Sequence, residues 1–194
     1  NKWFSPLVAV DIVIFTVYNW ELCVLINKPH LTNGVYTLPW SIVPKWQSLE
    51  ESFDMILKEQ TWISWVYKEQ LFTFSDPKRD PRAHVFSVSY YALVSFEKFQ
   101  NEVDLTKIDI VKFKDIDNIE FWYDHKIIIK KADERLNFRL ETTNIVKELM
   151  PQIFRFSQLQ KMYELITLKE FDKRNFQKKV LSLWIIHETW KLDK

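Results

Sequence analysis

The alternation of apolar and polar residues divides the chain into strands and helices in mixed order. Two runs rich in Val, Ile and Phe, residues 7–17 and 21–27, bracket a two-residue turn and predict a β-hairpin. Ser48 and Glu51 form a capping-box pattern ahead of apolar residues at helical spacing, which predicts a helix. Further extended segments are predicted at 38–44, 66–74, 84–95 and 108–113, and a second helix at 124–141.

This order of elements predicts an α+β fold in which helices cover both faces of a sheet, an α/β/α sandwich, over residues 1–145. The pattern changes in the last forty residues. Two short amphipathic helices at 158–167 and 173–183, followed by a strand at 185–189, predict a winged helix-turn-helix over residues 146–194 with a truncated wing. Ser157 and Asp172 are the expected N-caps of these two helices.

Glycine is almost absent. The chain has one glycine and nine tryptophans, whereas about 7% glycine is usual. Trp20 falls in the hairpin turn, where both residues need positive φ, and Trp62 and Trp184 follow helices where a C-terminal glycine is common. We hypothesise that the tryptophans stand at codons that the source organism reads as glycine, with a naturally tryptophan-rich surface as the alternative. Turn-like contexts also surround Trp40, Trp46, Trp65, Trp122 and Trp190.

Charge is distributed unevenly along the chain. Residues 1–150 have a net charge of −3, whereas residues 151–194 have 9 basic and 5 acidic residues, or +4, which favours a small basic C-terminal module. The single cysteine, Cys23, lies in an apolar run, which predicts a buried free thiol in a reducing compartment. No run approaches the ~18 apolar residues of a membrane span, and no signal-peptide pattern is present. We expect a cytoplasmic protein with no membrane partner.

Three segments together resemble Nudix proteins. Residues 38–63, LPWSIVPKWQSLEESFDMILKEQTWI, resemble the Nudix box G-x5-E-x7-R-E-U-x-E-E-x-G-U, in which U is aliphatic. Residues 69–95 resemble the corresponding strands and loop of ADP-ribose pyrophosphatases and of Nudix-related transcriptional regulators of the NrtR type. The tail, from FSQLQKMYELI to DKRNFQKKVLSLWIIHET, resembles the winged helix of those regulators. The resemblance implies a Nudix sandwich with a C-terminal winged helix, and ADP-ribose or a pentose as the ligand.

The segment that resembles the Nudix box lacks most of the carboxylates that Nudix hydrolysis requires. Nudix hydrolysis needs several carboxylates on one helix face to hold Mg²⁺, and only Glu59 remains, because Gln60 replaces its neighbour. We therefore expect no catalytic residue, no metal site and no cofactor. An active hydrolase of the ADP-ribose pyrophosphatase type, which would need Mg²⁺, is the alternative. Ser41, Gln47, Met55, Ile56 and Trp62 stand at the remaining departures from the box.

A Nudix fold without its metal site can still bind the ligand that its relatives cleave. In the loop 75–82, Arg79 and Arg82 are predicted to pair with phosphates, and Asp80 to orient an arginine or accept ribose hydroxyls. Glu59 completes the predicted ligand-binding set. A solvated charged turn is the alternative for this loop.

The second helix of the tail presents basic and amide side chains on its outer face. These residue types contact phosphates and base edges from the major groove, so DNA is the predicted partner, and two half-sites imply a homodimer. The whole pattern predicts a ligand-responsive transcriptional regulator, and the alternative for the tail is dimerisation alone. The predicted DNA-binding residues are Lys173, Arg174, Asn175, Gln177 and Lys178.

Overall fold

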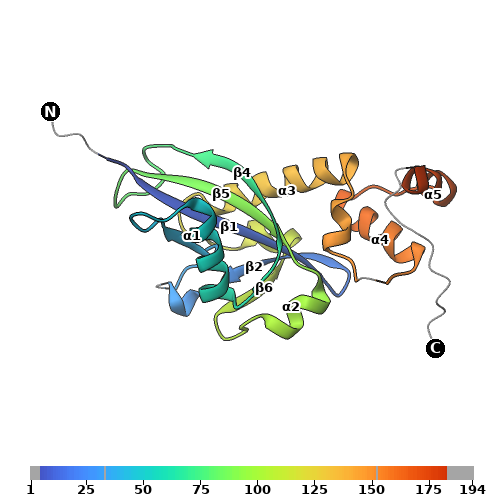
Figure 1. Cartoon of the computed structure of the whole chain (residues 1–194), viewed down its shortest axis with the longest axis horizontal. Coiled ribbons are helices and arrows are strands. Elements are labelled where there is room, and N and C mark those ends of the chain that lie inside the picture. Colours follow the sequence, from blue (N-terminus) through green and yellow to red (C-terminus); the bar gives the residue numbers. More distant parts are fainter. Residues whose placement is uncertain (1–4, 33, 152, 183–194) are drawn as a thin grey trace.

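A mixed β-sheet forms the centre of the protein (Figure 1), in a computed structural model that describes residues 5–32, 34–151 and 153–182. The strand order is β4-β5-β1-β2-β6, with β3 paired to β1 outside this path. The long strand β1 lies at the centre, parallel to β5 and antiparallel to β2 and β3. The strands are β1 (Leu7–Tyr18), β2 (Glu21–Asn27), β3 (Trp40–Ile42), β4 (Tyr67–Phe74), β5 (Val85–Leu93) and β6 (Ile108–Lys112).

Helices cover both faces of this sheet, as predicted for an α+β sandwich. Phe53 of α1 and Phe99 of α2 belong to a buried cluster on one face, whereas Ile128 and Leu136 of α3 belong to the cluster on the other. The second cluster continues without a break into α4 and α5, so the tail shares a core with the sheet. The helices are α1 (Leu49–Ile56), α2 (Phe96–Glu102), α3 (His125–Thr142), α4 (Phe156–Thr167) and α5 (Lys173–Ser182), with short turns η1 (Pro29–Leu31), η2 (Leu57–Thr61), η3 (Phe113–Asn118) and η4 (Ile145–Glu148).

Local signals set most element boundaries correctly. The capping box is formed as predicted, because Ser48 Oγ accepts from the Glu51 amide and Glu51 Oε2 accepts from the Ser48 amide. The prediction that Ser157 caps α4 was wrong, because the N-cap position is Arg155. The helix begins at Phe156 because Gln158 Oε1 accepts from the amide of Arg155, 2.7 Å away, and so satisfies the chain one residue earlier. Helix α2 was not predicted, and the expected strand 185–189 lies outside the described residues.

Three tryptophans have the left-handed backbone conformation. The φ angles are 59° at Trp20, 71° at Trp46 and 65° at Trp62, and all three side chains are exposed. Trp40 lies in β3, so its turn-like interpretation was wrong, and Trp65 and Trp122 have no positive φ. Trp184 and Trp190 lie outside the described residues.

The buried thiol predicted for Cys23 is present in β2, where burial raises its pKa. Within residues 5–32, 34–151 and 153–182, no helix has the length and apolar character needed to cross a membrane.

Glu69 of β4 joins the sheet to α3. Its carboxylate accepts hydrogen bonds from Arg135 and Arg139 of α3, at 2.8 Å each, and from the hydroxyls of Tyr67 and Tyr91. Burial alone would raise the pKa of Glu69, but these donors, Arg139 foremost, lower it to about 2. The carboxylate is therefore a stabilising link between strand and helix while it is ionised.

Glu69→Gln should lower the free energy of unfolding by about 2 kcal/mol near neutral pH, allowing for the partly exposed arginines. The depressed pKa means that this contribution is complete above pH ~4.5 and disappears as the pH falls toward about 2. Urea unfolding from pH 7 to pH 2.5 checks this, because the two proteins should converge in acid. Asp54→Asn, at an ion pair with Lys68, is the control and should keep the parental pH profile.

Candidate functional site

A buried carboxylate interrupts the apolar centre of β1. Asp11 is 1% exposed and lies opposite Trp40 of β3 and Ser89 of β5 in the sheet registers. Its Oδ2 accepts hydrogen bonds from the Ser87 hydroxyl and from Arg79 Nη2, the latter at 3.1 Å. This placement explains why a charged residue is tolerated inside a strand that is otherwise Val, Ile and Phe.

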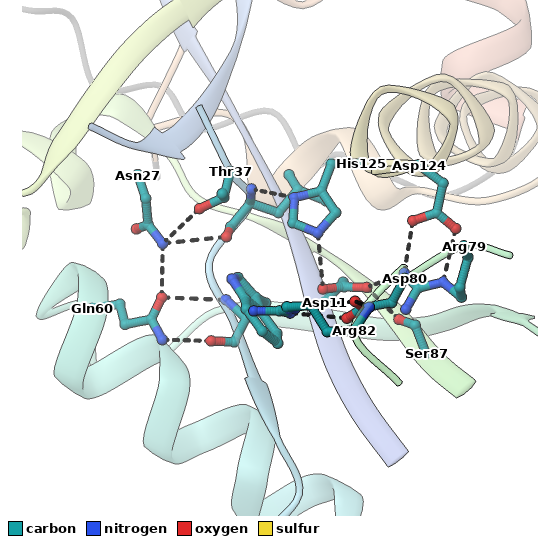
Figure 2. A network of polar contacts seen from close by, with 12 residues as sticks. Asp11, Asn27, Thr37, Gln60, Arg79, Asp80, Arg82, Ser87, Asp124 and His125 are labelled. Atoms are coloured by element: carbon teal, nitrogen blue, oxygen red, sulfur yellow. Dashed lines mark hydrogen bonds and ion pairs between the residues drawn. The ribbon is translucent and has the colours of Figure 1, made fainter. Parts of the chain in front are cut away.

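Arg79 connects the β4–β5 loop to α3 as well as to β1. Its Nε and Nη2 donate to the two carboxylate oxygens of Asp124, at 2.9 and 2.7 Å, just before α3 begins (Figure 2). Burial alone would lower the pKa of Arg79, but the bond to Asp124 and the charge of Asp11 raise it. The guanidinium is buried and bonded on two sides, so it fixes the loop from within.

His125 completes what we call the Asp11 network, which consists of Asp11, Arg79, Ser87, Asp124 and His125. The Nδ1 of His125 accepts a hydrogen bond from the Leu38 amide at 3.0 Å, which assigns the ring proton to Nε2. That Nε2 lies 3.5 Å from Asp11 Oδ1. Burial lowers the pKa of His125, so the ring is neutral and structural.

Asp80 and Arg82 form a separate pair on the same loop. Asp80 is buried and accepts from the Nε and Nη2 of Arg82, at 3.0 and 2.8 Å, so its pKa is lowered. The Arg82 side chain is 51% exposed, and its guanidinium lies 5.2–5.6 Å from the ring centres of Trp40, Trp122 and Tyr123. Asp80 therefore orients Arg82, and Arg82 is the arginine of the predicted pair that solvent can reach.

Gln60 holds β3 in place through its amide. Its Oε1 accepts from Asn27 Nδ2 at 2.9 Å and from the Trp40 amide at 3.2 Å, and its Nε2 donates to the Trp40 carbonyl at 2.7 Å (Figure 2). A carboxylate has no proton with which to make the third bond. The residue that would be a metal-binding glutamate in the Nudix box is thus a structural clamp on the β3 backbone.

Gln60→Glu should destabilise the protein by about 1–3 kcal/mol, because the new carboxylate faces the Trp40 carbonyl that Gln60 now satisfies. Thermal unfolding at pH 7 measures the loss. Glu59→Gln makes the opposite exchange at the exposed neighbouring position and should leave the melting temperature unchanged. Equal stability of Gln60→Glu and the parent would show that the clamp is unimportant.

Glu59 lies in a different place from the arginine loop. It lines a groove of about 560 Å³ together with Gln60, Trp40 and Lys107, and Lys107 Nζ donates to its backbone carbonyl. No group of three His, Cys, Asp or Glu side chains that could hold a metal occurs among the residues that the structure describes. A single exposed carboxylate beside a fully bonded amide does not fit a Mg²⁺ ion that bridges a pyrophosphate.

The predicted ligand-binding residues therefore fall into two groups. Arg79, Asp80 and Arg82 lie together over β1 and α3, and Glu59 lies in the groove. Trp40 touches both, since it lines the groove and packs against Arg82. The sequence identifies Asp11 as a polar interruption of an apolar strand that faces either solvent or a site, and the structure buries it in the site. The contacts of Gln60 were not predicted. The ligand-binding role of all four residues stays a prediction.

In the tail, α5 has one buried and one exposed face. Phe176 and Val180 are buried, and Asp172 caps the helix as predicted, accepting from the Asn175 amide at 3.0 Å. The exposed face carries the five predicted DNA-binding residues, namely Lys173, Arg174, Asn175, Gln177 and Lys178. Their side chains are accessible to a partner, and their contact with DNA stays a prediction.

Helix α4 connects this face to the rest of the protein. Its buried side includes Leu159, Met162 and Ile166, which share one apolar cluster with Val17 and Leu22 of the β1–β2 hairpin. Beyond the end of α4, Lys169 pairs with Glu141 of α3 at 2.6 Å. The two regions are packed together rather than loosely tethered.

Comparison with known proteins agrees with this architecture. The family model of the NrtR DNA-binding winged helix domain matches residues 146–194. The ADPR responsive transcriptional repressor of Acinetobacter baylyi is 28% identical over 193 residues, which cover 95% of this chain and 76% of that protein. An ADP-ribose pyrophosphatase of Methanocaldococcus jannaschii is 29% identical over 129 residues, which cover 66% and 73%.

Solved structures of Shewanella oneidensis NrtR have the same fold. The protein alone superposes with a TM-score of 0.83 at 27% identity, over 91% of this chain and 85% of that one. Its complex with a 27mer DNA gives 0.82 at 26% identity, over 90% and 82%. Its NUDIX domain with ADP ribose gives 0.60 at 28% identity, over 69% and 90%. The chain is therefore a homologue of the NrtR regulators, with a Nudix fold and a C-terminal segment of the NrtR winged-helix type.

Proposed function

We propose that this protein is a transcriptional regulator that binds DNA through α5 and responds to ADP-ribose or a related sugar or nucleotide. The observation that carries the proposal is the exposed basic face of α5, within a segment that matches a DNA-binding winged helix. A basic helix face alone is commonly only solvated, but in this context it is positioned for the major groove. The relatives that bind DNA and ADP ribose support both halves of the proposal.

Arg82 is the residue we assign to the ligand's phosphates. Its guanidinium is half-exposed, oriented by Asp80 and bordered by aromatic rings, so it combines charge with a preset direction. Arg79 is engaged with Asp11 and Asp124 and acts by holding the loop that presents Arg82. Glu59 remains the candidate for a ribose hydroxyl or an amine at the far end of the ligand.

Helix α3 is the element that contacts both ends of the proposed regulator. Asp124, directly before it, binds Arg79 of the ligand loop, and Glu141 near its end pairs with Lys169 beyond α4. A ligand that moves the loop would bias the position of α3 and hence of α4 and α5. Regulation requires that the ligand prefer one of these arrangements over the other.

We further propose that the protein acts as a homodimer. One α5 makes few phosphate contacts, and a specific operator with two half-sites is read by a symmetric pair of recognition helices. The ligand would then alter DNA affinity by changing the separation of the two helices.

Hydrolysis of ADP-ribose is the second candidate function, favoured by the similarity to an ADP-ribose pyrophosphatase. The residues that would hold Mg²⁺ argue against it. Among the described residues, Glu59 has no second carboxylate beside it with which to bind a metal, and the Gln60 side chain is hydrogen-bonded to the β3 backbone. Incubation with ADP-ribose and Mg²⁺ decides between the two. Release of AMP that disappears in Glu59→Gln would establish an enzyme, and no release is expected.

The regulator is tested by binding of the full-length protein to the DNA upstream of its own gene, with and without ADP-ribose. Specific binding that weakens steeply with salt supports the proposal, because neutralised phosphates release counterions. Absence of any salt-sensitive affinity would overturn it.

A further inference from the structure

We infer that positions 20, 46 and 62 are occupied by glycine in the protein that its own cell makes, because the backbone there has the conformation that glycine adopts and tryptophan does not. Seven described residues have positive φ, and three of them are tryptophan. Only one is glycine, Gly34. A left-handed backbone is strained for a side chain with a Cβ and unstrained for glycine.

Each of the three positions lies in a turn or at a helix end, where positive φ favours glycine. Asn19 and Trp20, with φ of 50° and 59°, are the two central residues of the β1–β2 hairpin turn, where Asn-Gly is the favoured pair. Trp62, with φ 65° and ψ 2°, follows η2 and donates its amide to the Lys58 carbonyl, which is the geometry of a glycine that ends a helix. Trp46 lies in the turn before α1.

The three indoles do not gain enough contact to explain their presence. Trp46 is 92% exposed and Trp62 is 61% exposed, and Trp20 is 40% exposed with Lys161 above its ring. A large apolar side chain at a strained and exposed position contributes neither core packing nor a relaxed turn. Glycine satisfies the backbone at all three positions, which accounts for three of the nine tryptophans and for part of the shortage of glycine in the chain.

Glycine at position 62 also changes the groove beside Glu59, a consequence that rests on the proposed function. The Lys107 ammonium lies 5.6 Å from the Trp62 ring centre and also lines the groove. Without the indole, this cation loses the ring beside it and keeps its hydrogen bond to the Glu59 carbonyl. Lys107 then offers a cation to an anionic ligand in the groove.

The direct test is peptide mass spectrometry of the protein purified from its source organism, together with the codons at these positions. Glycine in the peptides that contain positions 20, 46 and 62 supports the inference, and tryptophan in them overturns it. This result is independent of ADP-ribose binding. The proposed function can therefore fail while the inference stands, and the inference can fail while the proposed function stands.

A second test uses variants of the tryptophan-containing chain. Trp20→Gly, Trp46→Gly and Trp62→Gly should each lower the equilibrium constant of unfolding by about threefold, since release of strain exceeds the added freedom of the unfolded chain. Trp65→Gly is the matched control, because Trp65 is 81% exposed without a positive φ. It should give no gain. Equal effects at positions 62 and 65 would contradict the inference.

Discussion

Reversing the charges of Lys173, Arg174 and Lys178 to glutamate should weaken binding to the upstream DNA by at least about 100-fold. All three side chains are exposed. Arg174 and Lys178 lie on the face of α5 opposite the buried Phe176 and Val180, and Lys173 is the first residue of the helix. Each phosphate contact contributes about 0.9 to the slope of log affinity against log salt, so the slope should fall by about 3 in magnitude. Fluorescence anisotropy over a salt series measures both effects.

The control for this experiment reverses the same number of exposed lysines away from α5. Lys45, Lys58 and Lys130 are exposed and lie before α1, in η2 and on α3, respectively. Reversal of these three changes the net charge equally and should leave most of the specific affinity. If instead the α5 variant kept its affinity, the tail would serve dimerisation only, and the proposed recognition helix would be wrong.

Replacing Arg79 with methionine should destabilise the protein by about 3–5 kcal/mol. The change removes the cation that compensates Asp11, which is 1% exposed, and it breaks the two bonds to Asp124. A buried carboxylate without its partner retains the full cost of desolvation. Urea unfolding at pH 7 measures the difference in the free energy of unfolding.

Arg82→Met is the matched control, because it makes the same exchange three residues along the same loop. Arg82 is half-exposed, and the buried Asp80 that loses it keeps its hydrogen bond from the Arg82 backbone amide, so the substitution should cost about 1–2 kcal/mol, less than Arg79→Met. Ligand binding should show the reverse order. Arg82→Met is expected to lose affinity for ADP-ribose while remaining folded. Equal destabilisation by the two substitutions would contradict the assignment of Arg79 to holding the loop and of Arg82 to binding the ligand.

Much of the fold could be predicted because it is specified by local patterns. The alternation in residues 7–27 gives a hairpin, and Ser48 with Glu51 starts α1 as expected. Helix α4 was misplaced at its start because the signal at Ser157 competes with Gln158, whose side chain caps Arg155 instead. The first residue of the helix depends on the side-chain conformations of Ser157 and Gln158, which a residue pattern does not specify.

The candidate site was only partly predictable for a different reason. Arg79, Asp80 and Arg82 were recognised as one loop, but their different roles depend on what lies beneath them. Asp11 and Asp124 are separated from Arg79 by 68 and 45 positions along the chain. The parallel pairing of β1 with β5 brings Asp11 to the loop, and the packing of α3 on the sheet brings Asp124. Gln60 was recognised as a lost carboxylate, whereas its contacts with the β3 backbone follow from the tertiary fold.

The affinity of the full-length protein for its upstream DNA, measured with and without ADP-ribose at several salt concentrations, tests the central claim most directly. We predict binding that falls steeply with salt, and a change in affinity of at least about fivefold on adding ADP-ribose, in the usual range of coupling between two sites. DNA binding that is insensitive both to salt and to the ligand would contradict a regulator in which the Nudix fold senses and the winged helix reads DNA.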